Sequence, residues 1–486
     1  MTANVQPSAL NILDATAQAE LVRRREASPL ELVDAAIQRI QKVNPQLNAV
    51  VWDRFEKARD EARSAHLPQA PFHGVPFLTK DLGCTTAGEP DSSGSRFLKE
   101  NRYVASVTTE LARRIQAAGF INLGRTNTPE FGAVATTEPL AWGPTRNPWD
   151  LTRTAGGSSG GSCAAVAALM VPVAHGSDGG GSIRVPAAAC GLVGLKPTRG
   201  RINIWPSTEW LTPVSVQGFQ TRTVRDLAAC MDFASGALPG DPMPPPTPVR
   251  SYASEVGVDP GKLRIGLWNR LPAALDGSLD PECQEAVEQA GKLLESLGHS
   301  VELAHPAILD DPKTSTIWSR IWAVRLLAAL ESFERKLGKK AGRDNLDPDT
   351  LYWLDRARGV SAADYVLALE DMDAFTRAFA GWWGHDRDGG YDVLVTPVTG
   401  TVTPKLGAFG MDSARLKTSV LWWPFTAYFN LAGQPAMSLP LHWTKDGLPV
   451  GVQLGAAYAR EDVLIRLAAQ LEEARPWSGH IPPVHA

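Results

Sequence analysis

The chain has 486 residues, of which 44% are hydrophobic and 21% are charged, and its formal net charge is -4. This composition is typical of a folded enzyme with a large core, and the charge gives no reason to expect nucleic acid or a membrane surface as partner. The five scattered cysteines form no CxxC pair or Cys/His cluster, so neither a zinc site nor a disulfide framework is predicted. No basic segment followed by an apolar run opens the chain, so we expect a cytoplasmic protein without a secretory signal.

The first third of the sequence alternates predicted helices and strands. The segment Ser28-Pro-Leu-Glu31 has the form of a capping box and starts an amphipathic helix. The apolar run 74–79 predicts a buried strand, which would place Lys80 at or just after the end of that strand. A helix over 106–118 and a strand after it continue the alternation. This order of elements indicates an α/β core.

The later elements continue this pattern around two distinctive stretches. Residues 238–249 contain six prolines and predict a surface loop or linker. Residues 310–388 are predicted to be mostly helical and are rich in tryptophan. The other predicted strands are 171–174, 263–267, 300–303, 392–396, 437–439 and 451–454, with a loop over 176–182, and the other predicted helices are 13–25, 163–170, 186–190, 281–297 and 461–473.

Two separate serines, each flanked by glycines, are the most informative feature of the sequence. Ser158 lies in Gly-Gly-Ser-Ser-Gly-Gly-Ser, and Ser182 lies 24 residues later in Gly-Ser-Asp-Gly-Gly-Gly-Ser-Ile-Arg. Lys80 belongs to a third compact segment, His-Gly-Val-Pro-Phe-Leu-Thr-Lys-Asp-Leu. A hydroxyl nucleophile needs a base and an oxyanion site, and glycines let backbone N–H groups approach a substrate closely. These three segments can supply both.

Two simpler motifs fit the first serine loop poorly. Residues 156–160 match G-x-S-x-G, but a nucleophile elbow needs a strand directly before the serine, and residues 147–155 form a poor strand. A phosphate-binding loop is not indicated, because no Gly-Lys-Ser/Thr follows the glycines.

Taken together, the Lys80 segment and the two serine loops resemble the amidase signature family of serine hydrolases, with weaker matches at 125–132, 429–436 and 447–454. The resemblance runs from about residue 8 to residue 475 and is weakest between 240 and 390. It implies an α/β fold in which a central mixed β-sheet is covered on both faces by helices. It also implies a single domain over 1–486, with a core at about 60–235 and 390–475 and a more variable, helix-rich region at about 240–390.

Members of that family use a Ser–cis-Ser–Lys triad. The resemblance therefore implies Ser182 as nucleophile, Ser158 as a bridging serine preceded by a cis peptide, and Lys80 as base. A lysine is a base only when it is neutral, which burial favours, and apolar residues precede Lys80. Ser158 can relay a proton, and the backbone N–H groups of Ser182 and of the three glycines before it can form the oxyanion hole, namely Gly179, Gly180 and Gly181. No metal or organic cofactor is implied.

The proposed base and relay each have an alternative. Lys80 could be a surface lysine at the end of a strand, which is the usual position of lysines. Ser158 and its neighbour Ser159 are chemically equivalent in the sequence, and only the spacing of 24 residues to Ser182 selects Ser158.

The charged residues near the motifs are interpreted as structural. We expect Asp178 and Arg184 to form an ion pair or to brace the loop. His73 and His175 lie nearest the motifs, but neither is followed by a triad-like aspartate. The glycine at position 179 departs mildly from the family's usual threonine and leaves the backbone donors intact.

The motif details around Ser182 are similar to a subgroup of the family that includes cyclic-dimer hydrolases of nylon oligomers and aryl-acylamidases. We expect an amidase that hydrolyses a carbon–nitrogen bond of a small-molecule or oligoamide substrate through an acyl-enzyme on Ser182. The alternatives are an amidotransferase subunit that releases ammonia with partner chains, and a urethane- or ester-cleaving hydrolase on the same triad. A catalytically silent binding protein is a third, against which the intact Lys80, Ser158 and Ser182 argue.

Several tryptophans outside the motifs are candidates for an aromatic-lined substrate pocket, although any one of them could simply fill the core. They are Trp205, Trp210, Trp318, Trp322, Trp422 and Trp423. Apart from the small-molecule amide we expect no nucleic-acid or membrane partner, and association into a homodimer is left open.

Overall fold

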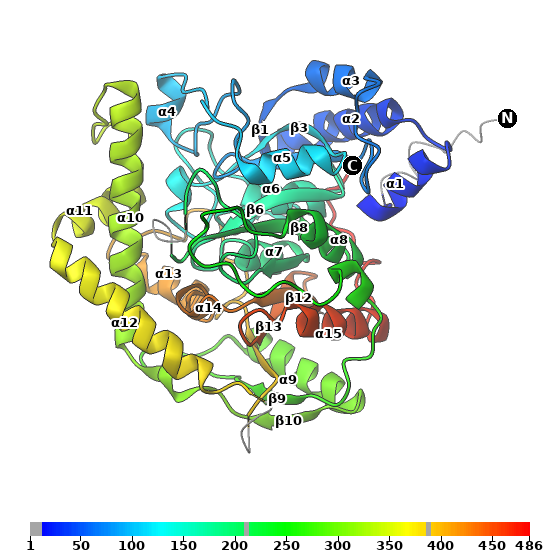
Figure 1. Cartoon of the computed structure of the whole chain (residues 1–486). Coiled ribbons are helices and arrows are strands. Elements are labelled where there is room, and N and C mark those ends of the chain that lie inside the picture. The colour runs from blue at the N-terminus through cyan, green and yellow to red at the C-terminus, as the bar shows by residue number, and fades with distance from the viewer. Residues whose placement is uncertain (1–11, 209–212, 385–389) are drawn as a thin grey trace.

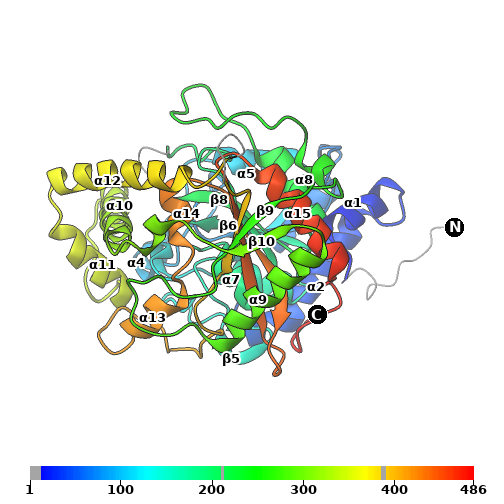
Figure 2. The ribbon, with the colours of Figure 1, turned by 90° about the horizontal axis from the view of Figure 1, so that it is seen from below.

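The computed structural model describes residues 12–208, 213–384 and 390–486. Across these residues a mixed sheet of eleven strands runs through the centre of the molecule, in the order β1-β3-β2-β6-β8-β7-β12-β13-β11-β9-β10. Helices cover both faces of this sheet (Figures 1 and 2). The predicted fold class is therefore confirmed, while the predicted domain limits stay a prediction.

The strands of the sheet come from most of the length of the chain. They are β1 Val50–Asp53, β2 Pro76–Lys80, β3 Ile121–Thr126, β6 Val173–Asp178, β7 Val193–Lys196, β8 Val216–Thr221, β9 Arg264–Leu267, β10 Ser300–Leu303, β11 Val393–Pro397, β12 Ala436–Trp443 and β13 Pro449–Ala456. A separate hairpin consists of β4 Arg146–Asn147 and β5 Asp150–Thr154. At the centre, β2 is parallel to both β3 and β6, and β6 is antiparallel to β8.

Two sets of helices pack on the two faces of the sheet. Successive residues of a strand point to opposite faces, so Phe77 of β2 joins one apolar core and Leu78 joins the other. The first core contains α1 Ala15–Arg23, α5 Glu110–Ala117, α8 Val224–Ala234, α9 Pro281–Ser296 and α15 Glu461–Ala474. The second contains α2 Pro29–Leu47, α3 Phe55–Arg63, α6 Gly160–Ala167 and α7 Arg184–Cys190.

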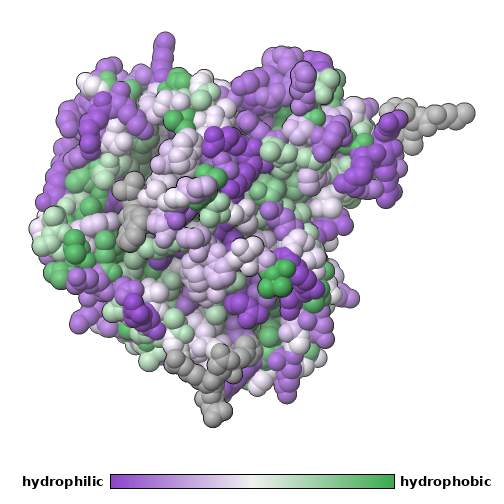
Figure 3. Space-filling view, viewed as in Figure 1, coloured by the Kyte–Doolittle hydropathy of each residue, from purple (hydrophilic) through white to green (hydrophobic). Residues whose placement is uncertain are grey.

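A third group of helices lies beside the sheet, on the left of Figure 1. It is built on α10 Lys313–Leu337, α11 Pro348–Arg358 and α12 Ala362–Ala380, with α4 Arg96–Glu100, α13 Leu416–Trp422 and α14 Ala427–Ala432 next to them. Apolar side chains gather on the surface over this layer (Figure 3). Val366 and Leu367 of α12 are exposed apolar residues of this region. The predicted helical character of this region is confirmed.

Several element boundaries follow from local capping and pairing. The capping box at Ser28 and Glu31 is present and starts α2. β6 was expected to end before a loop at 176–182, but it continues to Asp178 because β8 pairs with it along its whole length. β1, β7, β8 and the hairpin of β4 and β5 were not predicted, and the expectation that residues 147–155 form a poor strand is wrong for β5, Asp150–Thr154. None of the helices in the described ranges has the length and apolarity needed to span a bilayer.

Candidate active site

Lys80 is the last residue of β2, and its side chain is fully buried. Its neighbours in the sheet are the parallel strands β3 and β6, so the amine reaches the loops at the carboxyl ends of these strands. Burial lowers the pKa of Lys80 to about 7, although the negative charge of Asp178 acts in the opposite direction. The surface-lysine alternative is therefore wrong, because this amine lies inside the protein.

Three serine hydroxyls surround the Lys80 amine. Its Nζ lies 2.6 Å from Oγ of Ser158, 3.1 Å from Oγ of Ser159 and 3.0 Å from Oγ of Ser177. The peptide bond between Gly157 and Ser158 is cis. Ser158 makes the shortest contact with the amine, so the geometry agrees with the choice of Ser158 over Ser159 as bridging serine.

Ser182 lies on the second glycine-rich loop, between β6 and α7. The N–H group of Ser159 donates to the carbonyl of Ser182 at 3.2 Å, so the two serine loops are in direct contact. Ser182 is half-buried and faces a small pocket. The wall of this pocket is formed by Gly132, Ala133, Val134, Ala135, Gly180, Gly181, Trp318, Trp322 and Trp423.

Asp178 and Arg184 form an ion pair that braces the loop of Ser182, as the sequence predicted. Both side chains are fully buried, and Arg184 donates to the two carboxylate oxygens at 2.9 and 3.0 Å. The same carboxylate accepts from the N–H groups of Gly181 and Ile183 at 2.7 and 3.1 Å. Burial alone would raise the pKa of Asp178, but the charge and hydrogen bonds of Arg184 hold that pKa well below its usual range.

Two side chains fix the orientation of the glycine peptides before Ser182. The indole N–H of Trp318 donates to the carbonyl of Gly179 at 2.8 Å, and the hydroxyl of Thr426 donates to the carbonyl of Gly180. In a planar trans peptide the C=O and N–H groups point in opposite directions. Trp318 therefore sets the direction of the Gly180 N–H, and Thr426 sets the direction of the Gly181 N–H, which is engaged by Asp178.

The two histidines near the motifs occupy structural positions. Nδ1 of His175 accepts from the Lys80 backbone N–H at 3.3 Å, and its Nε2 lies 2.7 Å from Oε1 of Gln217. Burial lowers the pKa of His175 to about 3, although the bond to Gln217 opposes this, so the ring is neutral. His73 contacts the carbonyl of Pro68.

The candidate tryptophans divide into pocket and non-pocket residues. Trp318, Trp322 and Trp423 line the Ser182 pocket, with the rings of Trp318 and Trp322 stacked at 5.4 Å. Trp422 lies behind this wall and donates to the carbonyl of Ala135, while Trp205 is exposed beneath Arg113. The sixth candidate, Trp210, lies outside the described residues.

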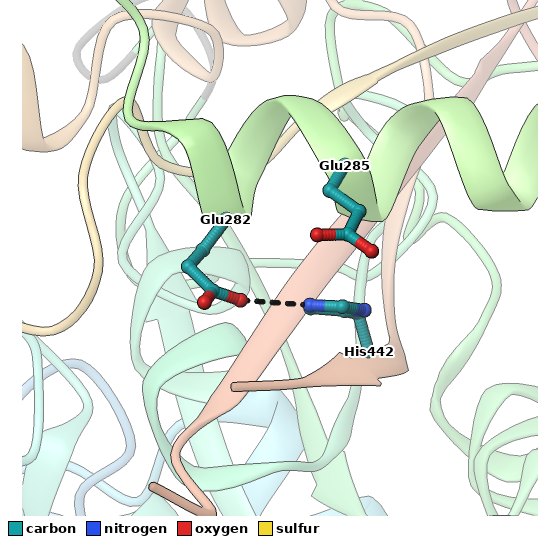
Figure 4. A group of neighbouring side chains, drawn as sticks. All are labelled: Glu282, Glu285 and His442. Atoms are coloured by element: carbon teal, nitrogen blue, oxygen red, sulfur yellow. Dashed lines mark hydrogen bonds and ion pairs between the residues drawn. The ribbon is translucent and has the colours of Figure 1, made fainter. Parts of the chain in front are cut away.

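Side chains of metal-ligand type gather elsewhere in the described part of the chain. Glu282 and Glu285 of α9 lie over His442 of β12, with one ligand atom from each within 4.8 Å of the others (Figure 4). Nε2 of His442 is 3.0 Å from Glu282, and Glu285 accepts from Gln289 at 2.7 Å. These hydrogen bonds explain why the three side chains lie close together. None of the three lines the Ser182 pocket.

Sequence reasoning missed several residues that complete the site. Asn430 donates to the Asp178 side chain and main chain at 2.9 and 3.0 Å, and Ser177 contacts the lysine amine. A Cβ atom on Gly132 would lie 3.2 Å from Oγ of Ser158. All three lie inside or next to segments that matched the family, so the motifs could have drawn attention to them. The spacing of residues alone did not show which groups they contact.

Comparisons with known proteins agree with this geometry. A family model described as amidase matches residues 31–465. The 6-aminohexanoate-cyclic-dimer hydrolase of Paenarthrobacter ureafaciens is 42% identical over 481 residues, which cover 96% of each chain. A solved structure of 6-aminohexanoate cyclic dimer hydrolase complexed with substrate matches with a TM-score of 0.92 at 41% identity, covering 98% of this chain and 100% of that one. The structure of a bacterial aryl acylamidase matches with a TM-score of 0.86 at 28% identity, covering 98% and 99%.

The family model spans most of the chain, and the similarity to the hydrolase extends over nearly the full length of both proteins. The resemblance predicted from the lysine and serine segments is thereby confirmed, together with the subgroup. The chain belongs to the amidase family and is a hydrolase that acts on amide bonds.

Proposed function

We propose that this amidase cleaves its substrate through an acyl-enzyme on Ser182, with Ser158 as proton relay and Lys80 as base. The observation that carries the proposal is the position of the buried Lys80 amine, whose Nζ lies 2.6 Å from Oγ of Ser158. The loop that contains Ser158 is hydrogen-bonded to the loop that contains Ser182. With a pKa of about 7, a large fraction of this amine is neutral at physiological pH and is able to accept a proton.

The reaction has two halves, acylation and deacylation of Ser182, and both use the same residues. Oγ of Ser182 attacks the amide carbon while its proton passes to Ser158, and the proton of Ser158 passes to Nζ of Lys80. The carbonyl electron pair moves to oxygen, and its return breaks the C–N bond as the proton travels back through Ser158 to the leaving amine. Water then attacks the ester in the same way, which releases the carboxylic acid and restores Ser182.

The oxyanion in each half is held by backbone N–H groups of the glycine loop. The sequence assigned this role to Ser182 and to the three glycines before it, Gly179, Gly180 and Gly181. Because the Gly181 N–H donates to Asp178, we now place the donors at Gly179, Gly180 and Ser182. Removing one such donor typically costs about 3 kcal/mol of transition-state stabilisation.

For the substrate we propose a small-molecule or oligomeric amide with apolar chains. The relatives that act on the cyclic dimer of 6-aminohexanoate support an oligoamide, and the aromatic wall of the pocket suits methylene chains. These relatives are hydrolases, so the amidotransferase alternative is not favoured. Urethane or ester cleavage on the same triad, a homodimer and a cytoplasmic location stay as proposals.

A fluorophosphonate probe tests the triad directly. Peptide mass spectrometry of the treated protein should find one adduct, on Ser182. The adduct should disappear in Ser182→Ala, form much more slowly in Lys80→Ala, and be unchanged in Ser296→Ala, which alters an exposed hydroxyl on α9. An adduct on Ser158 or Ser159, or a rate of labelling that does not depend on Lys80, would overturn the assignment.

A further inference from the structure

A second cavity adjoins the Ser182 pocket. It measures about 270 Å³, and its wall includes Gly83, Phe131, Ser215, Gln217 and Arg325. Phe131 is followed in the chain by Gly132, which lines the Ser182 pocket. Ser215 also approaches the nucleophile loop, because its Oγ would lie 3.2 Å from a Cβ atom on Gly179. The two hollows are therefore neighbours beside the Ser182 loop.

Trp322 links the wall of the Ser182 pocket to Arg325, which lines the second cavity. It lines the Ser182 pocket, and its Cζ3 would lie 2.6 Å from a Cβ atom on Gly179. Arg325 follows three residues later on α10, so the two side chains lie on one face of that helix. The Arg325 guanidinium carbon is 5.8 Å from the Trp322 ring, so the cation of the second cavity borders the wall of the first.

Both of these side chains carry a buried donor without an acceptor. Within the described ranges, Nε of Arg325 and Nε1 of Trp322 have no hydrogen-bond partner. A buried donor that is left unsatisfied costs stability. The described residues hold other such groups, and these two lie on the walls of the two neighbouring cavities. A ligand with oxygen atoms at the border of the two cavities would provide the acceptors that these donors lack.

The charge at this place is positive and unpaired. Burial lowers the pKa of Arg325 only to about 10, so the guanidinium is charged at neutral pH. No carboxylate of the described chain forms a salt bridge with it, although most other arginines of α10–α12 lie beside an acid, as Arg335 does beside Glu331. The acid in the cavity wall, Asp91, is occupied by the N–H and hydroxyl of Ser93.

We propose that Arg325 and Trp322 form a subsite for a carboxylate group of the substrate. This rests on the proposed amidase function and names its substrate class, which is amides that carry a carboxylate on a short chain beside the scissile bond. A guanidinium matches a carboxylate with two parallel hydrogen bonds. A cyclic oligoamide has no free carboxylate, whereas a linear one ends in a carboxylate, so the subsite favours linear, acid-terminated amides.

Two matched substrate pairs test the subsite and show on which side of the amide the carboxylate binds. The first pair is glutaric acid mono-4-nitroanilide and butyric acid 4-nitroanilide, which place or omit a carboxylate on the acyl side. The second pair is N-acetyl-6-aminohexanoate and N-hexylacetamide, which do the same on the amine side. We expect the wild type to prefer the acid in at least one pair.

Arg325→Gln should lower kcat/KM for that acid by about 10- to 100-fold, the range of a hydrogen bond to a charged group, and leave its neutral partner within about twofold. Arg325→Lys should recover part of the loss, because it keeps the charge and loses the planar fork. Arg335→Gln, an exposed position on the same helix, should change neither substrate.

Equal losses on the acid and its neutral partner in Arg325→Gln, or a wild type without preference in both pairs, would overturn the subsite. Hydrolysis of none of the four amides would instead contradict the proposed substrates. In that case, calorimetric titration with glutarate decides about the subsite alone. Binding by the wild type that is lost in Arg325→Gln supports it, and no binding by the wild type removes it.

Discussion

The nucleophile loops and the α10 helix meet at the Ser182 pocket, but different interactions hold them. In the loops, buried polar groups are paired, since Lys80 faces three hydroxyls and Asp178 is bound to Arg184 and Asn430. On α10, aromatic packing dominates, and Trp322 and Arg325 keep buried N–H groups without acceptors. The difference teaches that the proposed reacting groups are held by partners within the protein, whereas the α10 wall keeps N–H groups that our proposed substrate would bind.

The two regions are in contact at two glycines of the Ser182 loop, Gly179 and Gly180. A Cβ atom on Gly179 would lie 2.6 Å from the Trp322 ring, and one on Gly180 would lie 2.7 Å from the Trp318 ring. The tryptophans therefore pack directly against the backbone that leads to Ser182. Any side chain at positions 179 or 180 would displace the aromatic wall or the loop, so the packing of one region limits the sequence of the other.

The largest effect on the loops with paired polar groups is expected from removing the proposed base, Lys80. Lys80→Met keeps the length and apolar stem of the side chain and deletes the amine, so kcat/KM should fall by about 10⁴-fold or more. Because the variant no longer buries an amine, its unfolding midpoint in urea should not decrease. Steady-state hydrolysis and urea titration measure both, and retention of a tenth of the activity would contradict the triad.

The next largest effect is expected from the Asp178–Arg184 pair. Asp178→Asn leaves a buried guanidinium without its carboxylate, so the free energy of unfolding should fall by about 3–5 kcal/mol. Asp373→Asn is the control, because its partner Arg377 is exposed and the expected change is within about 0.5 kcal/mol. Denaturant titration measures both variants, and equal small changes would show that the loop does not depend on this pair.

A pH profile sharpens the comparison without any substitution. In the proposed mechanism the neutral form of Lys80 is the active one, so kcat/KM should rise about tenfold per pH unit below pH 7 and level off above it. Burial depresses the pKa of this lysine, so the unfolded chain binds the extra proton, and the contribution of Lys80 makes the fold more stable as pH rises above about 7. A profile that is flat between pH 5.5 and 8 would argue against lysine as the base.

The smallest effect is expected from substitutions of the tryptophans in the wall of the Ser182 pocket. Trp318→Phe keeps a ring in place but removes the hydrogen bond to the Gly179 carbonyl, which orients the N–H of Gly180. Loss of one hydrogen bond between neutral groups should lower kcat by about 2- to 10-fold and change KM little. Trp322→Phe makes no such change to the loop and should alter KM instead. If both variants change only KM, the indole of Trp318 does not position the oxyanion site.

Local sequence signals predicted the elements that depend on nearby residues. The capping box at Ser28, the strand that ends at Lys80 and the ion pair of Asp178 with Arg184 are all short-range features. β8 had no comparable signal, because its polar residues and internal glycine mask the alternation, and its place is set by pairing with β6 and β7. The engaged N–H of Gly181 was also invisible, since its direction depends on Thr426, far along the chain.

The sequence by itself predicted the chemistry proposed for this protein, because a lysine after an apolar run and two glycine-flanked serines at a set spacing are local patterns that resemble a known family. Only the tertiary structure decided how that chemistry is surrounded. Burial, which moves the pKa of Lys80, arises from contacts such as the one with Ser158, which is 78 residues along the chain, and the packing of Trp318 beside the Ser182 loop joins residues 139 apart. Such contacts depend on how the helices pack against the sheet, and no short stretch of sequence contains that information.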